Sequence, residues 1–137
     1  MTNEQQQLVK SSFREVERVG LIVALCFYQK LFELDPSLRP LFHTDIEEQS
    51  KKLLQALKMV SEGIQRFPEV LPAIESLGRR HVRYGVKAKD YETVGQALLW
   101  TLEESLGADF TGEVRAAWAA AFDLVAAAMK RAAAKVK

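Results

Sequence analysis

The stretch Leu77–Gly85, LGRRHVRYG, contains His81, one of only two histidines in a chain of 137 residues. Around it, Ile74, Leu77, His81 and Tyr84 follow one another at steps of three or four residues, which places them on one face of a helix. That spacing predicts a buried apolar face. A buried imidazole without a partner is costly, so His81 needs a hydrogen-bond acceptor, a carboxylate or a metal.

The composition indicates one domain over residues 1–137, with enough chain for a sizeable core. Nineteen basic and eighteen acidic residues give a formal charge of +1, which provides no general electrostatic reason to bind nucleic acid or an anionic membrane. Cys26 is the only cysteine and cannot form an internal disulfide, so we expect a cytoplasmic protein. The N-terminal MTNEQQQLVK does not resemble a signal peptide, and the apolar run 19–28 is too short to span a bilayer.

Apolar residues recur with helical spacing along the chain, and no segment favours a strand. The pattern predicts an all-α bundle of about seven helices. One expected helix runs from about Gly20 to Leu34 and carries Leu21, Leu25, Tyr28 and Phe32 on one stripe. Caps for the other expected elements are Asn3, Asp35, Thr44 or Asp45, Asp90 and Thr111.

Two polar side chains interrupt apolar stripes. Gln49 precedes Leu53 by one helical turn, and Tyr28 brings a hydroxyl to the stripe of the second helix. Taken separately, Gln49 can border a helix start and Tyr28 can bond a backbone carbonyl. Taken with an inward histidine, they are typical of a mostly apolar small-molecule site with a few converging polar groups.

The order of these residues resembles the globin family, specifically the single-domain bacterial haemoglobins and the globin domain of flavohaemoglobins. The resemblance extends over nearly the whole chain. It rests on Tyr28 in LCFYQKLFELDP, Pro40 and Phe42 in RPLF, Gln49 and Leu53 in EEQSKKLL, His81 in LGRRHVRYGV, Tyr91 in DYETVGQALL, and Trp118 in RAAWAAAFDLV.

The resemblance implies a globin fold around a b-type haem, with a short connection between Phe42 and Gln49. His81 corresponds to the proximal iron ligand, whose second ring nitrogen would donate to a backbone carbonyl such as that of Leu77. Phe42 corresponds to the ring that packs against the haem. Leu53 and Tyr91 are further residues expected to line the cofactor site.

On the distal side, the resemblance places Tyr28 and Gln49 over the open iron position. Both can donate hydrogen bonds to bound dioxygen, which carries partial negative charge, whereas carbon monoxide gains less. We therefore expect slow oxygen release and high affinity, with Tyr28 the stronger donor. A resting state with two histidine ligands would require His43, which we expect at the surface near the haem edge.

A basic cluster surrounds His81 and consists of Arg79, Arg80, Arg83, Lys87 and Lys89. Such a run is usually a solvated helix face, and a nucleic-acid patch is the alternative. The propionates of the haem that the resemblance implies are anions closer to this basic cluster than a nucleic acid would be. Arg80 and Lys52 are the candidates for pairing with them.

The chain departs from the flavohaemoglobin pattern at one proximal position. Tyr91 is present, but Ala133 stands where a glutamate is expected fifteen residues after Trp118. That change predicts a histidine that donates less electron density than in a dedicated dioxygenase or peroxidase. An oxidative cycle would also require an external reductase.

These observations favour a haemoglobin that reversibly binds dioxygen, and that also meets carbon monoxide and nitric oxide, as a monomer or weak homodimer. The alternative is a nitric oxide dioxygenase served by a separate cellular reductase. A third possibility is a cofactor-free helical adaptor. It would use the same amphipathic stripes to bind a partner, and Tyr28 and Gln49 would have no chemical role.

Overall fold

The computed structural model describes residues 1–42 and 45–136, and this part of the chain is helical with no strand. The helices are α1 (Asn3–Arg18), α2 (Gly20–Leu34), α3 (Ile46–Gly63), α4 (Phe67–Arg83), α5 (Asp90–Leu106) and α6 (Gly112–Ala133). Three short 3₁₀ segments join them: η1 (Pro36–Leu41), η2 (Ile64–Arg66) and η3 (Gly107–Asp109). The expected all-α architecture is confirmed. No helix among the described residues is long and apolar enough to cross a membrane.

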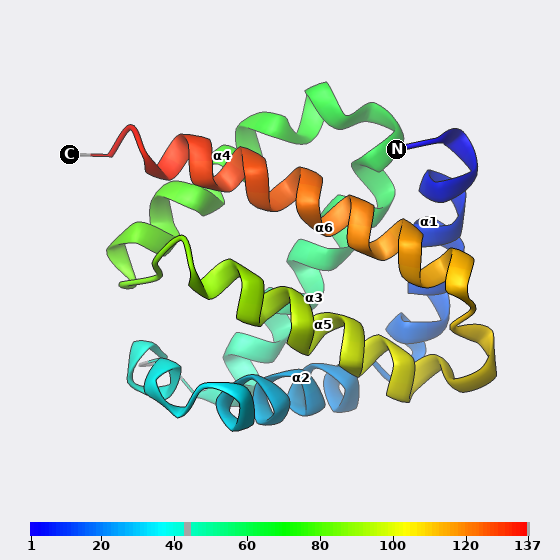
Figure 1. Cartoon of the computed structure of the whole chain (residues 1–137), viewed down its shortest axis with the longest axis horizontal. Coiled ribbons are helices and arrows are strands. Elements are labelled where there is room, and N and C mark those ends of the chain that lie inside the picture. Colours follow the sequence, from blue (N-terminus) through cyan, green and yellow to red (C-terminus); the bar gives the residue numbers. More distant parts are fainter. Residues whose placement is uncertain (43–44, 137) are drawn as a thin grey trace.

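The helices pack as crossing layers rather than as a parallel bundle (Figure 1). In that view α6 and α5 run across the front, α2 lies below α5, and α3 passes behind them. Helix α4 packs mainly against α6, whereas α2 contacts both α5 and α3. The two helices that carry Tyr28 and Gln49 are therefore direct neighbours.

The main core is formed by buried apolar residues from both halves of the chain. Trp118 of α6 is 2% exposed, and its indole Nε1–H donates to the Ser12 hydroxyl of α1 at 2.8 Å. Val9, Phe13 and Val16 of α1 are buried in the same cluster. This bond satisfies the one polar atom of the indole and joins the first helix to the last.

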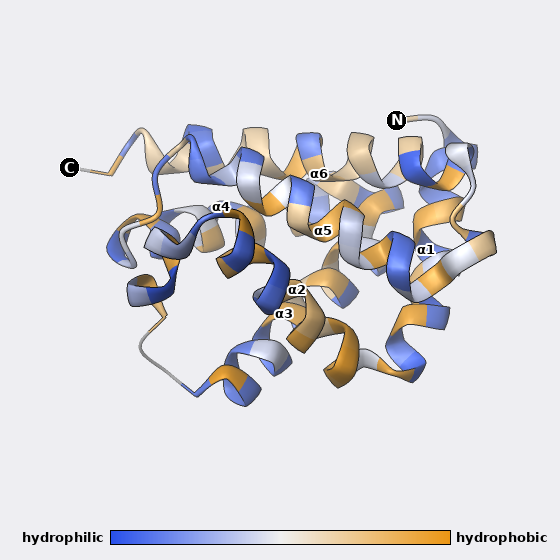
Figure 2. Cartoon of the chain, turned by 60° about the horizontal axis from the view of Figure 1, so that its bottom comes forward, coloured by the Kyte–Doolittle hydropathy of each residue, from blue (hydrophilic) through white to orange (hydrophobic). Residues whose placement is uncertain are grey.

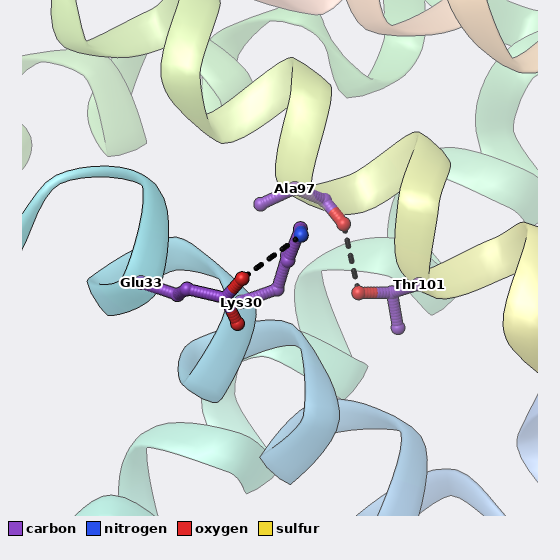
Figure 3. Close-up of polar contacts among 4 residues, drawn as sticks. All are labelled: Lys30, Glu33, Ala97 and Thr101. Atoms are coloured by element: carbon purple, nitrogen blue, oxygen red, sulfur yellow. Dashed lines mark hydrogen bonds and ion pairs between the residues drawn. The ribbon is translucent and has the colours of Figure 1, made fainter.

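Helices α2 and α5 pack against each other, and Figure 3 shows two polar contacts on these helices, Lys30 with Glu33 and Thr101 with Ala97. The Lys30 Nζ lies 3.3 Å from a Glu33 carboxylate oxygen and 4.7 Å from the centroid of the Trp100 ring. Inside α5, the buried Thr101 hydroxyl donates to the Ala97 carbonyl at 2.7 Å. The hydroxyl is thus satisfied within its own helix, which offsets the cost of burying it.

Two predicted helix caps are wrong by one residue. Thr2, not Asn3, caps α1, because its hydroxyl accepts from the Gln5 N–H while the Gln5 side chain accepts from the Thr2 N–H. Asp90 is the first residue of α5 rather than its cap, and its buried carboxylate accepts from the Lys87 N–H at 2.8 Å. The aspartate closes the preceding turn instead.

The remaining predicted caps lie where the sequence suggested, within the described residues. Asp35 caps η1 with Pro36 at its first position, and Thr111 caps α6. Asp45 caps α3 by accepting from the Glu47 N–H, while the alternative cap Thr44 lies outside the described residues. The expected short connection between Phe42 and Gln49 likewise falls partly on residues 43 and 44, outside that description.

Hydrophobic and hydrophilic residues alternate along the helices (Figure 2), but three residues expected to face inward do not. Leu21 and Leu25 of α2 are each 38% exposed, and Tyr84 is 50% exposed. Tyr84 is the C-cap of α4, at the very end of the helix. Leu25 borders a surface pocket that Arg39 of η1 and Ile46 of α3 also line.

Helix α4 is held against α6 by a contact that only glycine permits. A Cβ atom at Gly78 would lie 2.5 Å from the Met129 carbonyl oxygen and 2.7 Å from its Cα. These are backbone atoms that cannot rotate away. Gly78 therefore sets how closely the helix that carries His81 approaches α6.

Candidate functional site

His81 lies near the C-terminal end of α4, and its side chain is half-buried. Its Nδ1 lies 2.6 Å from the Leu77 carbonyl oxygen, one helical turn earlier. A carbonyl can only accept, so Nδ1 carries the proton and Nε2 holds the lone pair in the neutral ring. The predicted contact between His81 and Leu77 is confirmed.

The surroundings of His81 favour its neutral form. Burial lowers the pKa of the imidazole, the bond to the Leu77 carbonyl opposes this, and the nearby Arg80 charge lowers it further. A neutral imidazole with Nδ1 engaged has Nε2 as its ligating atom. The site thus has a nitrogen of the type that binds iron.

Tyr28 of α2 contacts the backbone of Gln49 of α3, which is the alternative that the sequence left open, a tyrosine hydroxyl bonded to a backbone carbonyl. The Tyr28 hydroxyl donates to the Gln49 backbone carbonyl at 3.3 Å, and Tyr28 is 6% exposed. This bond is longer than most O–H···O bonds. Burial raises the pKa of Tyr28 to about 12, so its hydroxyl keeps its proton and remains a donor at neutral pH.

Aromatic rings surround the Tyr28 side chain. The Tyr28 and Phe42 centroids lie 5.3 Å apart with an interplanar angle of 72°, and Phe32 packs edge-on to Phe42 at the same distance. Phe27 completes the group at 5.1 Å from Tyr28. Leu53 and Phe42 are half-buried and pack at the margin of the main core.

The turn after α4 brings the histidine helix close to the segment that carries Phe42. Gly85 ends this turn with φ of +92°, a conformation that L side chains rarely adopt. A Cβ at Gly85 would lie 3.0 Å from a methyl group of Leu41, the residue before Phe42. His81 and Phe42 therefore belong to segments that touch.

Tyr91 and Leu77 belong to a second, smaller core cluster between α4, α5 and α6. Tyr91 is 7% exposed, and burial raises the pKa of its hydroxyl. The Lys130 Nζ lies over its ring, 5.5 Å from the centroid. A cation from α6 thus lies over Tyr91. The same helix carries Ala133 at the position where the resemblance led us to expect a glutamate.

Lys52 and Arg80, the residues expected to pair with propionates, are both exposed. Neither forms an ion pair with another described residue, and no group of three or more His, Cys, Asp or Glu in that part of the chain could hold a metal ion. His43, the second candidate iron ligand, lies outside the described residues.

The sequence reasoning missed Arg39, whose guanidinium carbon lies 5.1 Å from the centroid of the Phe32 ring. Arg39 stands between two prolines in DPSLRPLF, and nothing in that pattern indicates an aromatic partner. Phe32 itself follows Tyr28 by one helical turn. The only feature of the sequence that pointed to this part of the site was therefore the position of Phe32 on the same helical stripe as Tyr28.

The chain belongs to the globin family, whose sequence profile matches residues 25–129. The flavohemoprotein of Vibrio cholerae serotype O1 is 30% identical over 129 residues, and that of Bordetella parapertussis is 33% identical over the same length. Each alignment covers 92% of this chain. The chain spans about a third of the length of these relatives, at 33% and 32%.

Solved structures of bacterial globins have the same fold. An engineered carbene transferase derived from a putative nitric oxide dioxygenase of Rhodothermus marinus superposes with a TM-score of 0.90 and 29% identity, covering 98% of this chain and 94% of that one. A bacterial globin from Campylobacter jejuni gives a TM-score of 0.87 and 25% identity, covering 98% of this chain and 97% of that one.

Membership of the globin family implies that the cofactor is haem. The residues present fit such a group. The neutral His81 ring, with Nδ1 held by the Leu77 carbonyl, would present Nε2 to the haem iron, and the aromatic group of Tyr28, Phe32 and Phe42 would pack against an apolar macrocycle. The exposed Lys52 and Arg80 are suited to pair with carboxylates at the solvent edge.

Proposed function

We propose that this chain binds haem b through His81 and reversibly binds dioxygen, with Tyr28 and Gln49 stabilising the bound gas. The observation that carries the proposal is the short bond from His81 Nδ1 to the Leu77 carbonyl. It orients the ring, fixes its tautomer and raises the basicity of Nε2. A buried histidine without a haem would also bond a backbone carbonyl, so the proposal rests on this bond together with membership of the globin family.

Haem iron supplies, when bound, one open coordination position at which a diatomic gas attaches. Tyr28 then acts as the principal hydrogen-bond donor. Its long bond to the Gln49 carbonyl costs little to exchange for a shorter bond to a ligand with partial negative charge. The Gln49 amide is the second donor, and the aromatic rings of Phe32 and Phe42 keep bulk water away.

The proposal predicts slow oxygen release that depends on Tyr28. Tyr28→Phe removes one donor to a charged acceptor, worth about 1.5–3 kcal/mol, and should speed dissociation about ten- to a hundredfold. Gln49→Leu should have a smaller effect of the same sign. Stopped-flow displacement of oxygen by carbon monoxide measures both rates.

Tyr84→Phe is the matched control, because Tyr84 is the exposed tyrosine at the end of α4. Its dissociation rate should equal that of the unmodified protein, and carbon monoxide release should change little in all three variants. Equal oxygen release from Tyr28→Phe and the parent would assign the stabilising bond to another residue.

A second candidate function is the oxidation of nitric oxide to nitrate. It is favoured by the similarity to flavohemoproteins and to an engineered protein derived from a putative nitric oxide dioxygenase. Ala133 stands where a glutamate is expected and the Lys130 cation lies over Tyr91, so we expect weaker electron donation to His81 than in a dedicated dioxygenase and rank this function second.

Turnover distinguishes the two functions. An oxygen-loaded sample mixed with nitric oxide tests the single reaction, whereas repeated turnover also requires an electron donor. Sustained nitrate production with a supplied reductase would make the dioxygenase the principal function. A single burst of nitrate without continued turnover under those conditions would leave oxygen binding as the principal function.

A further inference from the structure

The turn that follows α4 is closed by two hydrogen bonds, and one of them ends on His81. The Val86 N–H donates to the His81 carbonyl at 3.0 Å, and the Gly85 N–H donates to the Val82 carbonyl at 3.0 Å. Tyr84 is the C-cap of the helix, and Gly85, with φ of +92°, is the residue after it. Two such bonds around a residue of positive φ form a Schellman motif. His81 therefore accepts the bond that closes the helix.

His81 is held in this way at both its side chain and its backbone. The ring Nδ1 donates to the Leu77 carbonyl at 2.6 Å, which fixes the side chain to the preceding turn. The His81 carbonyl accepts from the Val86 N–H, which fixes the backbone to the following turn. The direction of Nε2 depends on both bonds, because the ring is oriented relative to the backbone that carries it.

Gly85 is the residue that allows the second of these bonds. L side chains rarely adopt a φ of +92°, since their Cβ atom crowds the adjacent backbone. Rotation of this residue to a negative φ would turn the Val86 N–H away from the His81 carbonyl. A side chain at position 85 must therefore either strain the turn or release the bond to His81.

The segments on either side of Gly85 leave the turn little freedom to adjust. A Cβ at Gly85 would lie 3.0 Å from a methyl group of Leu41, which packs against the main core. Val86 packs against the smaller core cluster, and the next residue, Lys87, donates its N–H to the buried Asp90 carboxylate at 2.8 Å. The connection to α5 is also short (left in Figure 1). Strain at this turn therefore acts on the end of α4.

We propose that Gly85 is a positioning residue for the axial histidine. Its positive φ keeps the His81 carbonyl bonded to the Val86 N–H, and this bond holds Nε2 where it binds the haem iron. The inference rests on the proposed function. A haem-free protein relieves a strained turn by giving up the Val86 bond, whereas haem binding restores both the bond and the strain. A side chain at position 85 therefore weakens haem binding.

The test compares Gly85→Ala with the parent after loading with haem. Haem transfer to apomyoglobin should be about tenfold faster from Gly85→Ala, because alanine is strained at a positive φ. The iron–histidine stretching band in the resonance Raman spectrum of the reduced protein should shift as well, since it reports directly on the bond made by Nε2. Helical circular dichroism verifies that the variant folds.

Gly107→Ala is the matched control for backbone strain. Gly107 is the other described glycine with a positive φ, at +54°, and a Cβ there meets nothing within 4 Å. It lies at the end of α5, away from the His81 turn. Alanine at this position should lower stability through the same kind of strain, but it should leave the Raman band and the rate of haem transfer at their parent values.

Gly85→Asn should rescue the defect of Gly85→Ala. Asparagine adopts a positive φ more readily than alanine and is found at this position of such turns. Its Cβ meets only the end of the flexible Leu41 side chain, which can shift by a few tenths of an ångström. The haem transfer rate and the Raman band of Gly85→Asn should therefore lie close to those of the parent.

Hydrogen exchange tests the same bond without any substitution. Because haem binding and the Val86 bond support each other, loading the parent with haem and carbon monoxide should slow exchange of the Val86 amide about tenfold. The Phe110 amide, which donates to the Gly107 carbonyl at 3.0 Å, is the control and should change little. In the haem-free state, the Val86 amide should exchange faster in Gly85→Ala than in the parent.

Parent values of haem transfer and of the Raman band in folded Gly85→Ala would overturn the inference. Equal changes in Gly107→Ala, or a Gly85→Asn protein as defective as Gly85→Ala, would also overturn it. If Gly85→Ala does not fold, the parent alone decides, because Val86 exchange that haem does not slow contradicts the inference. A parent that takes up no haem contradicts the proposed function itself, whereas failure of the inference alone appears in a parent that binds haem.

Discussion

His81 is the residue at which local helical geometry and chemistry agree most directly. A side chain near a helix C-terminus lies over the preceding turn, so a ring nitrogen of His81 can reach the Leu77 carbonyl. Spacing alone predicted a buried ring that needs a partner, and the resemblance to globins supplied both the Leu77 carbonyl and the iron-ligand role. A core histidine satisfied by a backbone carbonyl has the same spacing.

Tyr28 shows what burial adds to a residue that the sequence had already singled out. The stripe of α2 indicated a hydroxyl in an apolar region, but its partner, the Gln49 backbone carbonyl, belongs to α3. Contacts between helices depend on the crossing of α2 and α3, which periodicity does not specify. The residue was predictable, and its hydrogen-bond partner was not.

The raised pKa of Tyr28 predicts a specific loss of stability in alkali. Tyrosine in the unfolded chain ionises near 10.0, whereas burial raises the pKa of native Tyr28 to about 12. Its contribution is therefore fully present below pH 10 and is lost as the pH rises toward 12. We expect the free energy of unfolding of the haem-free protein to fall more steeply over this range than that of Tyr28→Phe.

Urea titrations at fixed pH measure both slopes, and tyrosinate absorbance follows ionisation directly. Tyr84→Phe should keep the steep slope of the parent, because Tyr84 is half-exposed. Tyr91, whose pKa burial also raises, contributes to the slope that remains in Tyr28→Phe. Parallel curves for the parent and Tyr28→Phe would show that Tyr28 ionises as an exposed tyrosine does.

At the scale of single elements, the sequence predicts helices better than their ends. Asp35, Asp45 and Thr111 are caps as expected, because each side chain finds a backbone N–H within its own turn. Asp90 is not a cap, because its carboxylate is recruited by the Lys87 N–H in the preceding loop. Competing local hydrogen bonds of this kind have the same sequence pattern as a cap.

The contact between α4 and α6 gives a prediction for Gly78. A methyl group at this position meets backbone atoms of Met129, so Gly78→Ala must push the helices apart. Overpacking of this kind costs about 1–3 kcal/mol, and the free energy of unfolding should fall by that amount. Because α4 carries His81, haem retention should fall as well.

Gly112→Ala is the matched control in the same measurements of urea unfolding and haem transfer. A Cβ at Gly112 meets nothing within 4 Å, and the residue begins α6. Alanine there should leave stability unchanged or raise it by a few tenths of a kcal/mol. Equal stability of Gly78→Ala and Gly112→Ala would mean that α4 and α6 can separate without cost.

At the scale of the whole molecule, the fold class follows from helical periodicity and the absence of strand patterns. The arrangement of the helices does not, since contacts such as Trp118 with Ser12 join residues that lie 106 apart in the chain. The order of motifs resembling globins supplied that arrangement, and the family match over residues 25–129 confirms it. The surface pocket lined by Leu25, Arg39 and Ile46 was not predictable, because it depends on how α2, η1 and α3 meet.

The most direct test of the account is the absorption spectrum of haem-supplemented protein in ferric, reduced, oxygen-bound and carbon monoxide-bound forms. The parent is compared with His81→Ala and with His43→Ala, which removes the other histidine. We expect a strong Soret band that responds to both gases in the parent and in His43→Ala, and loss of stable haem in His81→Ala. An unchanged spectrum in His81→Ala, or no stable Soret band in the parent, would contradict a globin site built on His81.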